Sequence, residues 1–124
     1  MSQILTKLDK LSGSECSVLF SGTKPIASSF PKDKLLYLKL GHQAFTLIFK
    51  QATKTNPDYD EAHIQIGHYR LMCYRVNDTS LFIALLPERS EIHKAQRVLR
   101  ESRPLFIKMI AKLTQASDKL KPAN

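Results

Sequence analysis

Apolar residues recur along the chain with two different periods, and the change from one to the other marks the elements. Residues 2–11 place an apolar side chain at every third or fourth position, which predicts an amphipathic helix. Residues 15–21 and 26–30 are rich in strand-forming side chains and flank the turn sequence Gly-Thr-Lys-Pro, so we expect an antiparallel hairpin. The chain therefore begins with a helix and two strands.

A long helix and three strands follow. The stretch 35–53 contains no proline and comes after a Pro-Lys-Asp start signal, which predicts the central helix. Strands are expected at 62–67, 69–76 and 80–86, where strand formers are bounded by turn residues. The last of the three is apolar almost throughout, which is typical of a strand in the middle of a sheet.

One more helix completes the pattern. Apolar side chains keep helical spacing over residues 92–113, and we expect Ser90 to be the N-cap. Pro104 lies inside this stretch and has no backbone N–H for a helix interior, so we expect a kink or a break there. With 124 residues the chain has room for one domain, which we place at 1–116, followed by a flexible tail at 117–124.

The central helix carries more apolar surface than one sheet face covers. On a helical wheel its apolar side chains span an arc of about 220°, against roughly 100° for an ordinary surface helix. The polar strip that remains is narrow and consists of Lys39, His42, Gln43, Thr46 and Lys50. We therefore expect two sides of this helix to be buried, one of them against the chain's own sheet.

Recognisable catalytic and cofactor motifs are absent from the sequence. It contains no phosphate-binding glycine-rich loop, no dinucleotide-binding fingerprint, no GxSxG nucleophile elbow and no HExxH zinc motif. The four histidines are scattered, and the acidic loop with Asp58, Asp60 and Glu61 lacks the ligand number and central glycine of a calcium loop. A hydrolytic set would need four residues that nothing in the sequence brings together: Ser28, Ser29, Asp33 and His42. We assign no catalytic residue, metal or cofactor.

The two cysteines, Cys16 and Cys73, are far apart and form no CxxC motif, so we expect two buried free thiols. The first residues are too polar for a signal peptide, and no apolar run approaches the roughly 20 residues of a transmembrane helix. A cytoplasmic location is the expectation from these features.

Net positive charge is the strongest compositional feature. Nineteen Lys and Arg against eleven Asp and Glu give a formal charge of +8, which attracts acidic proteins, nucleic acids and anionic lipids alike. Much of the excess lies in the last helix, on Lys94, Arg97, Arg100, Arg103, Lys108 and Lys112. This face is either simply solvated or binds a partner, and the lack of tryptophan, of a glycine-rich aromatic motif and of a helix-turn-helix pattern weakens nucleic acid as that partner.

The element order and several segments resemble the roadblock/dynein light chain family. Residues 16–29 (CSVLFSGTKPIASS) resemble its opening hairpin, residues 35–54 its central helix, residues 69–86 its last two strands and residues 92–113 its closing helix. The resemblance covers roughly residues 2–115 and ranks above a longin domain, which lacks a helix before the first strand. It implies an α/β (α+β) fold, a profilin-like sandwich around a five-stranded antiparallel sheet.

The resemblance also implies a function, that of a non-enzymatic interaction module. Proteins of this family dimerise through the central helix and the neighbouring edge strand. Carried over to this chain, the contact candidates are Tyr37, Leu40, Ala44, Phe45, Ile48, His63, Ile64, Gln65 and Ile66. The expected homodimer regulates or scaffolds a small Ras-like GTPase or a signalling or motility complex. The alternative is a basic protein that binds nucleic acid or an anionic surface through its last helix; a small enzyme is a third possibility, without support from the sequence.

Overall fold

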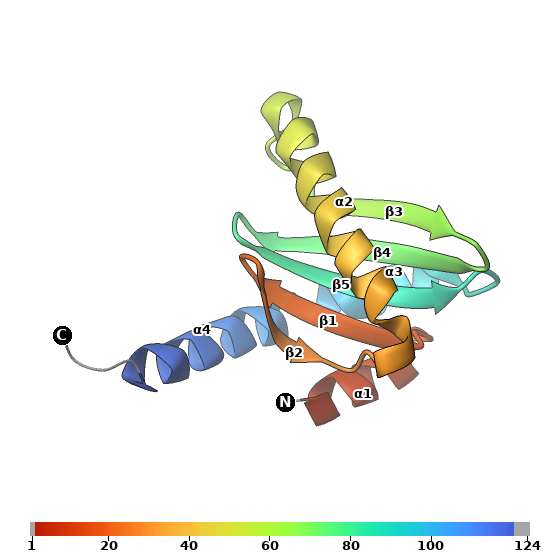
Figure 1. Cartoon of the computed structure of the whole chain (residues 1–124). Helices are drawn as coiled ribbons and strands as arrows, with labels where there is room; N and C mark the ends of the chain where they lie inside the picture. The colour runs from red at the N-terminus through yellow and green to blue at the C-terminus, as the bar shows by residue number, and fades with distance from the viewer. Residues whose placement is uncertain (1, 121–124) are drawn as a thin grey trace.

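A five-stranded antiparallel sheet with helices on both faces forms the centre of the molecule (Figure 1). This computed structural model describes the backbone of residues 2–120 and the side chains of residues 3–113. The spatial order of the strands is β2-β1-β5-β4-β3, and every neighbouring pair is antiparallel. The strand bounds are Cys16–Ser21 for β1, Lys24–Ser28 for β2, Glu61–Ile66 for β3, Tyr69–Asn77 for β4 and Ser80–Pro87 for β5. The predicted fold class is confirmed.

The helices divide between the two faces of the sheet. The long helix α2, Leu35–Thr55, crosses one face diagonally and is preceded by the short 3-10 helix η1, Lys32–Lys34 (Figure 1). The other face is covered by α1 (Ser2–Ser12), α3 (Ile92–Glu101) and α4 (Arg103–Leu120), and α4 extends past the sheet. None of these helices is long and apolar enough, within residues 2–120, to span a bilayer.

Two apolar cores result, because successive side chains of a strand point to opposite faces. In the central strand β5, Leu81, Ile83 and Leu85 pack toward α2, whereas Phe82, Ala84 and Leu86 pack toward α1, α3 and α4. Burial on both faces explains why this strand reads as a continuous apolar run. On α2, Gly41 allows close approach to the sheet, since a Cβ there would lie 3.1 Å from the Leu71 side chain.

The last helical stretch is two helices. The predicted break is confirmed: α3 ends at Glu101, Ser102 follows, and Pro104 lies in the first turn of α4, where a missing N–H costs nothing. The predicted cap was wrong, because the N-cap of α3 is Glu91, while the backbone of Ser90 belongs to the preceding turn and bonds to Pro87. α4 continues beyond the predicted start of the tail at residue 117 as far as Leu120, and residues 121–124 lie outside the described residues.

Polar groups buried between α1 and the sheet fix the position of the first helix. The carboxylate of Asp9, only 6% exposed, accepts hydrogen bonds of 2.6 Å from the hydroxyls of Ser17 and Ser29. Burial raises the pKa of Asp9, and these two hydrogen bonds lower it in part. The two cysteines are free and buried, as predicted, and burial raises the pKa of Cys16 to about 12 and that of Cys73 well above its ordinary value.

Candidate interaction surface

One side of α2 is apolar and exposed. Three leucines on this side remain in contact with water, with exposed fractions of 65% for Leu36, 44% for Leu40 and 59% for Leu47. Leu35, 40% exposed, lies one turn before Lys39 on the polar strip and is not part of this side. The sheet therefore covers only part of the wide apolar arc that the sequence contains, and the remainder is surface.

Half-buried apolar residues continue this surface toward the edge of the sheet. Ile64 and Ile66 of β3 pack at the margin of the core under α2, together with Tyr37 of the helix. The Tyr37 and Tyr69 rings meet edge to face with their centroids 5.4 Å apart, and Lys34 Nζ donates to Tyr69 Oη at 3.3 Å. Helix and strand thus contribute to one connected apolar area.

The two edges of the sheet differ in how well they are protected. β2 is short, carries the exposed Lys24 and Pro25, and pairs with β1 through an irregular register at Leu19 and Phe20. Such features hinder pairing with another strand. β3 contains neither proline nor lysine and pairs with β4 in regular register along Glu61–Ile66. Of the two edges, β3 is the one open to a further strand.

The free backbone groups of β3 can be assigned from its pairing with β4. The N–H of Arg75 donates to the carbonyl of Asp60, so Asp60 faces β4. Orientation alternates along an antiparallel strand, so the N–H and C=O groups of Glu61, His63 and Gln65 point away from the sheet. His63 is the middle residue of this free row.

The predicted contact residues divide into three groups. Leu40 is exposed and Tyr37, Ala44, Ile48, Ile64 and Ile66 are half-buried on the α2 side. Phe45 is fully buried in the core beneath α2 and is not available to a partner, which corrects its place among the candidates. His63 and Gln65 offer backbone groups to a partner, but their side chains lie on the opposite face of the sheet, where His63 pairs with Met72.

A charged cluster on that opposite face joins β3 to α3. Glu61 accepts hydrogen bonds from His63, at 2.8 Å, and from Gln96, and forms an ion pair of 3.0 Å with Arg100. Burial alone would raise the pKa of Glu61, but the two hydrogen bonds and the Arg100 charge outweigh it and hold the pKa below its ordinary value. The cluster keeps the helix on the strand, with Arg100 also paired with Asp60 at 3.2 Å.

The predicted basic face is only partly free. Arg100 is engaged in this cluster, and Arg103 donates to the carbonyl of Val76 at 3.2 Å. The side chains of the four others, together with two lysines of α1 that the sequence did not single out, are exposed: Lys7, Lys10, Lys94, Arg97, Lys108 and Lys112. Their charge was visible in the sequence, but the position of α1 next to α3 was not.

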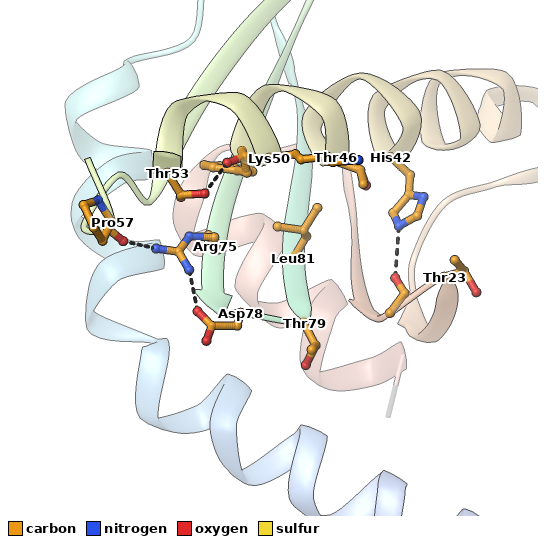
Figure 2. Close-up of a pocket in the computed structure, with 12 residues that line it drawn as sticks. Thr23, His42, Thr46, Lys50, Thr53, Pro57, Arg75, Asp78, Thr79 and Leu81 are labelled. Atoms are coloured by element: carbon orange, nitrogen blue, oxygen red, sulfur yellow. Dashed lines mark hydrogen bonds and ion pairs between the residues drawn. The ribbon is translucent and has the colours of Figure 1, made fainter. Parts of the chain in front are cut away.

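A cavity of about 590 Å³ lies between the polar strip of α2 and the turns that follow β1 and β4 (Figure 2). Arg75 forms one wall, and its guanidinium is occupied by Asp78 at 3.0 Å and by the carbonyls of Pro57 and Tyr59. His42 bonds to the Gly22 carbonyl at 3.1 Å. The Arg75 guanidinium and the His42 ring are thus engaged with the turns and the loop around the cavity, whereas Lys50 lines it as an exposed side chain.

The residues considered for a hydrolytic set are not brought together. Ser29 bonds to Asp9, the Ser28 hydroxyl accepts from the Phe30 N–H, and His42 stacks on Phe20 with ring centroids 4.0 Å apart. Among the side chains that the structure describes, those of residues 3–113, no group of three or more His, Cys, Asp or Glu is placed to hold a metal ion.

The arrangement of sheet, helices and cores is the fold of the roadblock/LC7 domain, which the sequence resemblance implied. MglB of Myxococcus xanthus has a TM-score of 0.67 over 99% of this chain and 92% of that chain, at 12% identity. A roadblock/LC7 domain from Streptomyces avermitilis has a TM-score of 0.65 over 86% of this chain and 98% of its own, at 10% identity. The gliding protein MglB from Thermus thermophilus has the same TM-score over 89% and 87% of the two chains, at 15% identity. No protein-family profile and no curated protein matches the sequence.

Proposed function

We propose that the chain is a non-enzymatic interaction module that forms a homodimer through β3 and the exposed side of α2. The observation that carries this proposal is the juxtaposition of an open edge strand with the exposed leucines of α2, above all Leu36 and Leu47. Strand pairing would satisfy the free backbone groups of β3, and helix packing would remove the leucines from water. The hydrogen bonds between the two β3 strands would fix the relative orientation of the copies, and burial of the apolar area would supply the free energy of association.

The apolar term is comparable to the cost of association, so that strand pairing adds stability once that cost is offset. Full burial of a leucine side chain contributes about 1.5–3 kcal/mol, and roughly half of that remains to be gained at each exposed leucine of α2. Because a two-fold interface uses every residue twice, the three leucines of this side contribute six times. The sum is of the order of the cost of bringing two chains together. A solved structure of the same fold, "MglB with tetrameric arrangement", gives further support for self-association.

The role proposed for the dimer is regulation or scaffolding of a small Ras-like GTPase, or of a signalling or motility complex, in the cytoplasm. Its support is the roadblock fold together with the neighbours of that fold, among them gliding protein MglB and MglC. The interaction surface of the dimer would be built by both copies, so the partner would bind the dimer and not the single chain.

Replacing Leu40 by Glu tests the dimer. The side chain is 44% exposed, so the fold tolerates the charge, whereas an apolar interface would have to bury it without a partner. We expect the wild-type chain to sediment as a dimer at micromolar concentration and Leu40→Glu to sediment as a folded monomer. Lys39→Glu, on the polar strip of the same helix, is the matched control and should remain dimeric.

The same variants test the GTPase role. Purified Ras-like GTPases, loaded with GDP or with a GTP analogue, are passed over the immobilised chain, and complex formation is expected to depend on the bound nucleotide and to be lost in Leu40→Glu. A monomeric wild-type chain would contradict the dimer, whereas a dimer that binds no GTPase in either nucleotide state would contradict only the role.

A further inference from the structure

Free basic side chains gather on the outer side of the helix layer, the face opposite to α2. Each of its three helices contributes two: Lys7 and Lys10 from α1, Lys94 and Arg97 from α3, Lys108 and Lys112 from α4. All six are exposed, and none of them forms an ion pair within the described part of the chain. We call these six residues the basic helix face.

The charge of this face is not neutralised locally. Glu91 and Glu101 are the exposed acidic residues on α3 and its N-cap, and the buried Asp9 is turned toward the sheet. Arg100 and Arg103 show the contrast, because the chain uses them itself, against Asp60, Glu61 and the Val76 carbonyl. The six remaining charges need an external counter-charge or water.

The apolar residues beside this face indicate which anionic partner it fits. The exposed large apolar side chains on the three helices are aliphatic, Leu11 at 62% and Ile107 at 46% exposed, and no aromatic side chain belongs to that exposed group within the described residues. Binding of single-stranded nucleic acid relies on aromatic rings that stack with bases. Lysines and arginines around aliphatic side chains are instead typical of surfaces that dock on anionic lipid headgroups.

We propose that the basic helix face docks on the surface of a bilayer that contains anionic phospholipids. The six cations lie against the headgroups, while Leu11 and Ile107 reach the boundary between headgroups and acyl chains. α2 then faces away from the bilayer and stays accessible, because it covers the opposite face of the sheet.

The proposed homodimer would strengthen this docking, and this part of the inference rests on it. Pairing of two β3 strands in one continuous sheet keeps the same faces of both copies on the same side. A dimer thus presents two basic helix faces to one bilayer, and the second binds at high effective concentration once the first is bound.

The experiment measures co-sedimentation of the full chain with vesicles. One set contains phosphatidylcholine alone and the other phosphatidylcholine with about one third phosphatidylglycerol, both at about 50 mM salt. We expect binding only to the anionic vesicles and release at about 0.5 M salt, where charges are screened within roughly 4 Å. The triple variant Lys7→Glu/Arg97→Glu/Lys108→Glu, with one change per helix, should bind at least about tenfold more weakly.

A matched triple variant controls for net charge. Lys32→Glu/Lys39→Glu/Lys50→Glu makes the same change of charge on exposed residues of η1 and α2, and it should bind anionic vesicles much more tightly than the first variant. Circular dichroism establishes that both variants fold. Equal binding by the two, or absence of wild-type binding to anionic vesicles, would overturn the proposal.

Two further measurements distinguish lipid binding by this face from nucleic-acid binding and from the proposed dimer. A 20-base-pair DNA duplex is titrated at the same salt, and tighter binding to the duplex than to vesicles, lost in the first triple variant, would make the face a nucleic-acid site and overturn the lipid assignment. Leu40→Glu should bind vesicles more weakly than wild type. If it matches wild type in both mass and binding, the proposed α2 interface fails while the lipid surface stands.

Discussion

At the residue scale, the carboxylate of Asp9 is buried between α1 and the sheet, where an apolar side chain would avoid the cost of desolvation. Asp9 receives hydrogen bonds from Ser17 and Ser29, which come from the first strand and from the end of the hairpin. The Ser29 hydroxyl in turn accepts from the Ser17 N–H at 2.8 Å. A buried charge with donors of fixed geometry specifies one position of α1 on the sheet, which apolar contact alone does not do.

Replacing Ser17 by Ala is expected to raise the pKa of Asp9 further above 3.8, because a hydrogen bond that favours the carboxylate is lost. The free energy of unfolding at pH 7 should fall by about 1–3 kcal/mol. A raised folded pKa means that the native state holds the proton more tightly, so this loss should shrink as the pH falls toward 3.8. Carbon-13 NMR titration of Asp9 and urea unfolding at several pH values measure both effects.

Ser14→Ala is the control for this prediction, since the Ser14 hydroxyl contacts Ser12 and not the carboxylate. An unchanged Asp9 titration in Ser17→Ala would show that the hydroxyl does not stabilise the charged form.

At the element scale, β3 combines a closed side and an open side. Its even-numbered residues hold the strand to β4, and its odd-numbered residues leave N–H and C=O groups without a strand partner along one row. A substitution can therefore remove an outward N–H of β3 and leave the pairing of β3 with β4 intact. Strand pairing between two copies can thus be tested separately from the fold of one copy.

Gln65→Pro removes an outward N–H of β3 and is expected to weaken the dimer by at least about tenfold, since proline cannot donate to a neighbouring strand. The β3–β4 ladder is retained, because the groups of Ile64 and Ile66 that face β4 are unchanged. Gln65→Thr, which keeps the N–H, should dimerise like wild type. Analytical ultracentrifugation across a concentration series measures the dissociation constants, and equal values for the two variants would exclude strand pairing through this row.

At the scale of the whole molecule, the sheet separates two surfaces with different chemistry. The α2 side is apolar and continues to an open strand, whereas the helix-layer side is basic. A protein built in this way can bind a second copy with one surface and an anionic surface with the other, without competition between them.

Dimerisation is expected to make thermal stability depend on concentration. If folding and association are coupled, the midpoint of unfolding should rise by about 2–3 °C for each tenfold increase in protein concentration. The midpoint of Leu40→Glu should not depend on concentration. Calorimetry over a hundredfold range measures both, and a wild-type midpoint that does not move would contradict coupling between the fold and the dimer.

Most of the fold could be predicted, because periodicity is a local property of the chain. The three- and four-residue spacing of apolar side chains predicted the helices, and the apolar run of β5 predicted its place in the middle of the sheet. Pro104 predicted the break between α3 and α4. The N-cap at Ser90 was wrong, because the turn after β5 takes up that residue and the helix begins one position later than its side chain could cap.

The candidate site was predicted less completely. The wide arc of α2 indicated a second contact surface, but it could not show that Phe45 faces the chain's own core while Leu40 faces water. That distinction depends on how α2 is rotated about its axis over the sheet, where Gly41 faces Leu71 at close approach.

The sequence by itself determined the order of elements, the excess of apolar surface on one helix and the excess of positive charge, since each depends on residues close together in the chain. Only the tertiary structure decided which charges remain free and which edge is open. Arg100 meets an acidic partner 40 residues away, and Lys7 joins a basic face formed by helices from the other end of the chain. Such contacts follow from packing, because they depend on which distant segments the sheet places side by side.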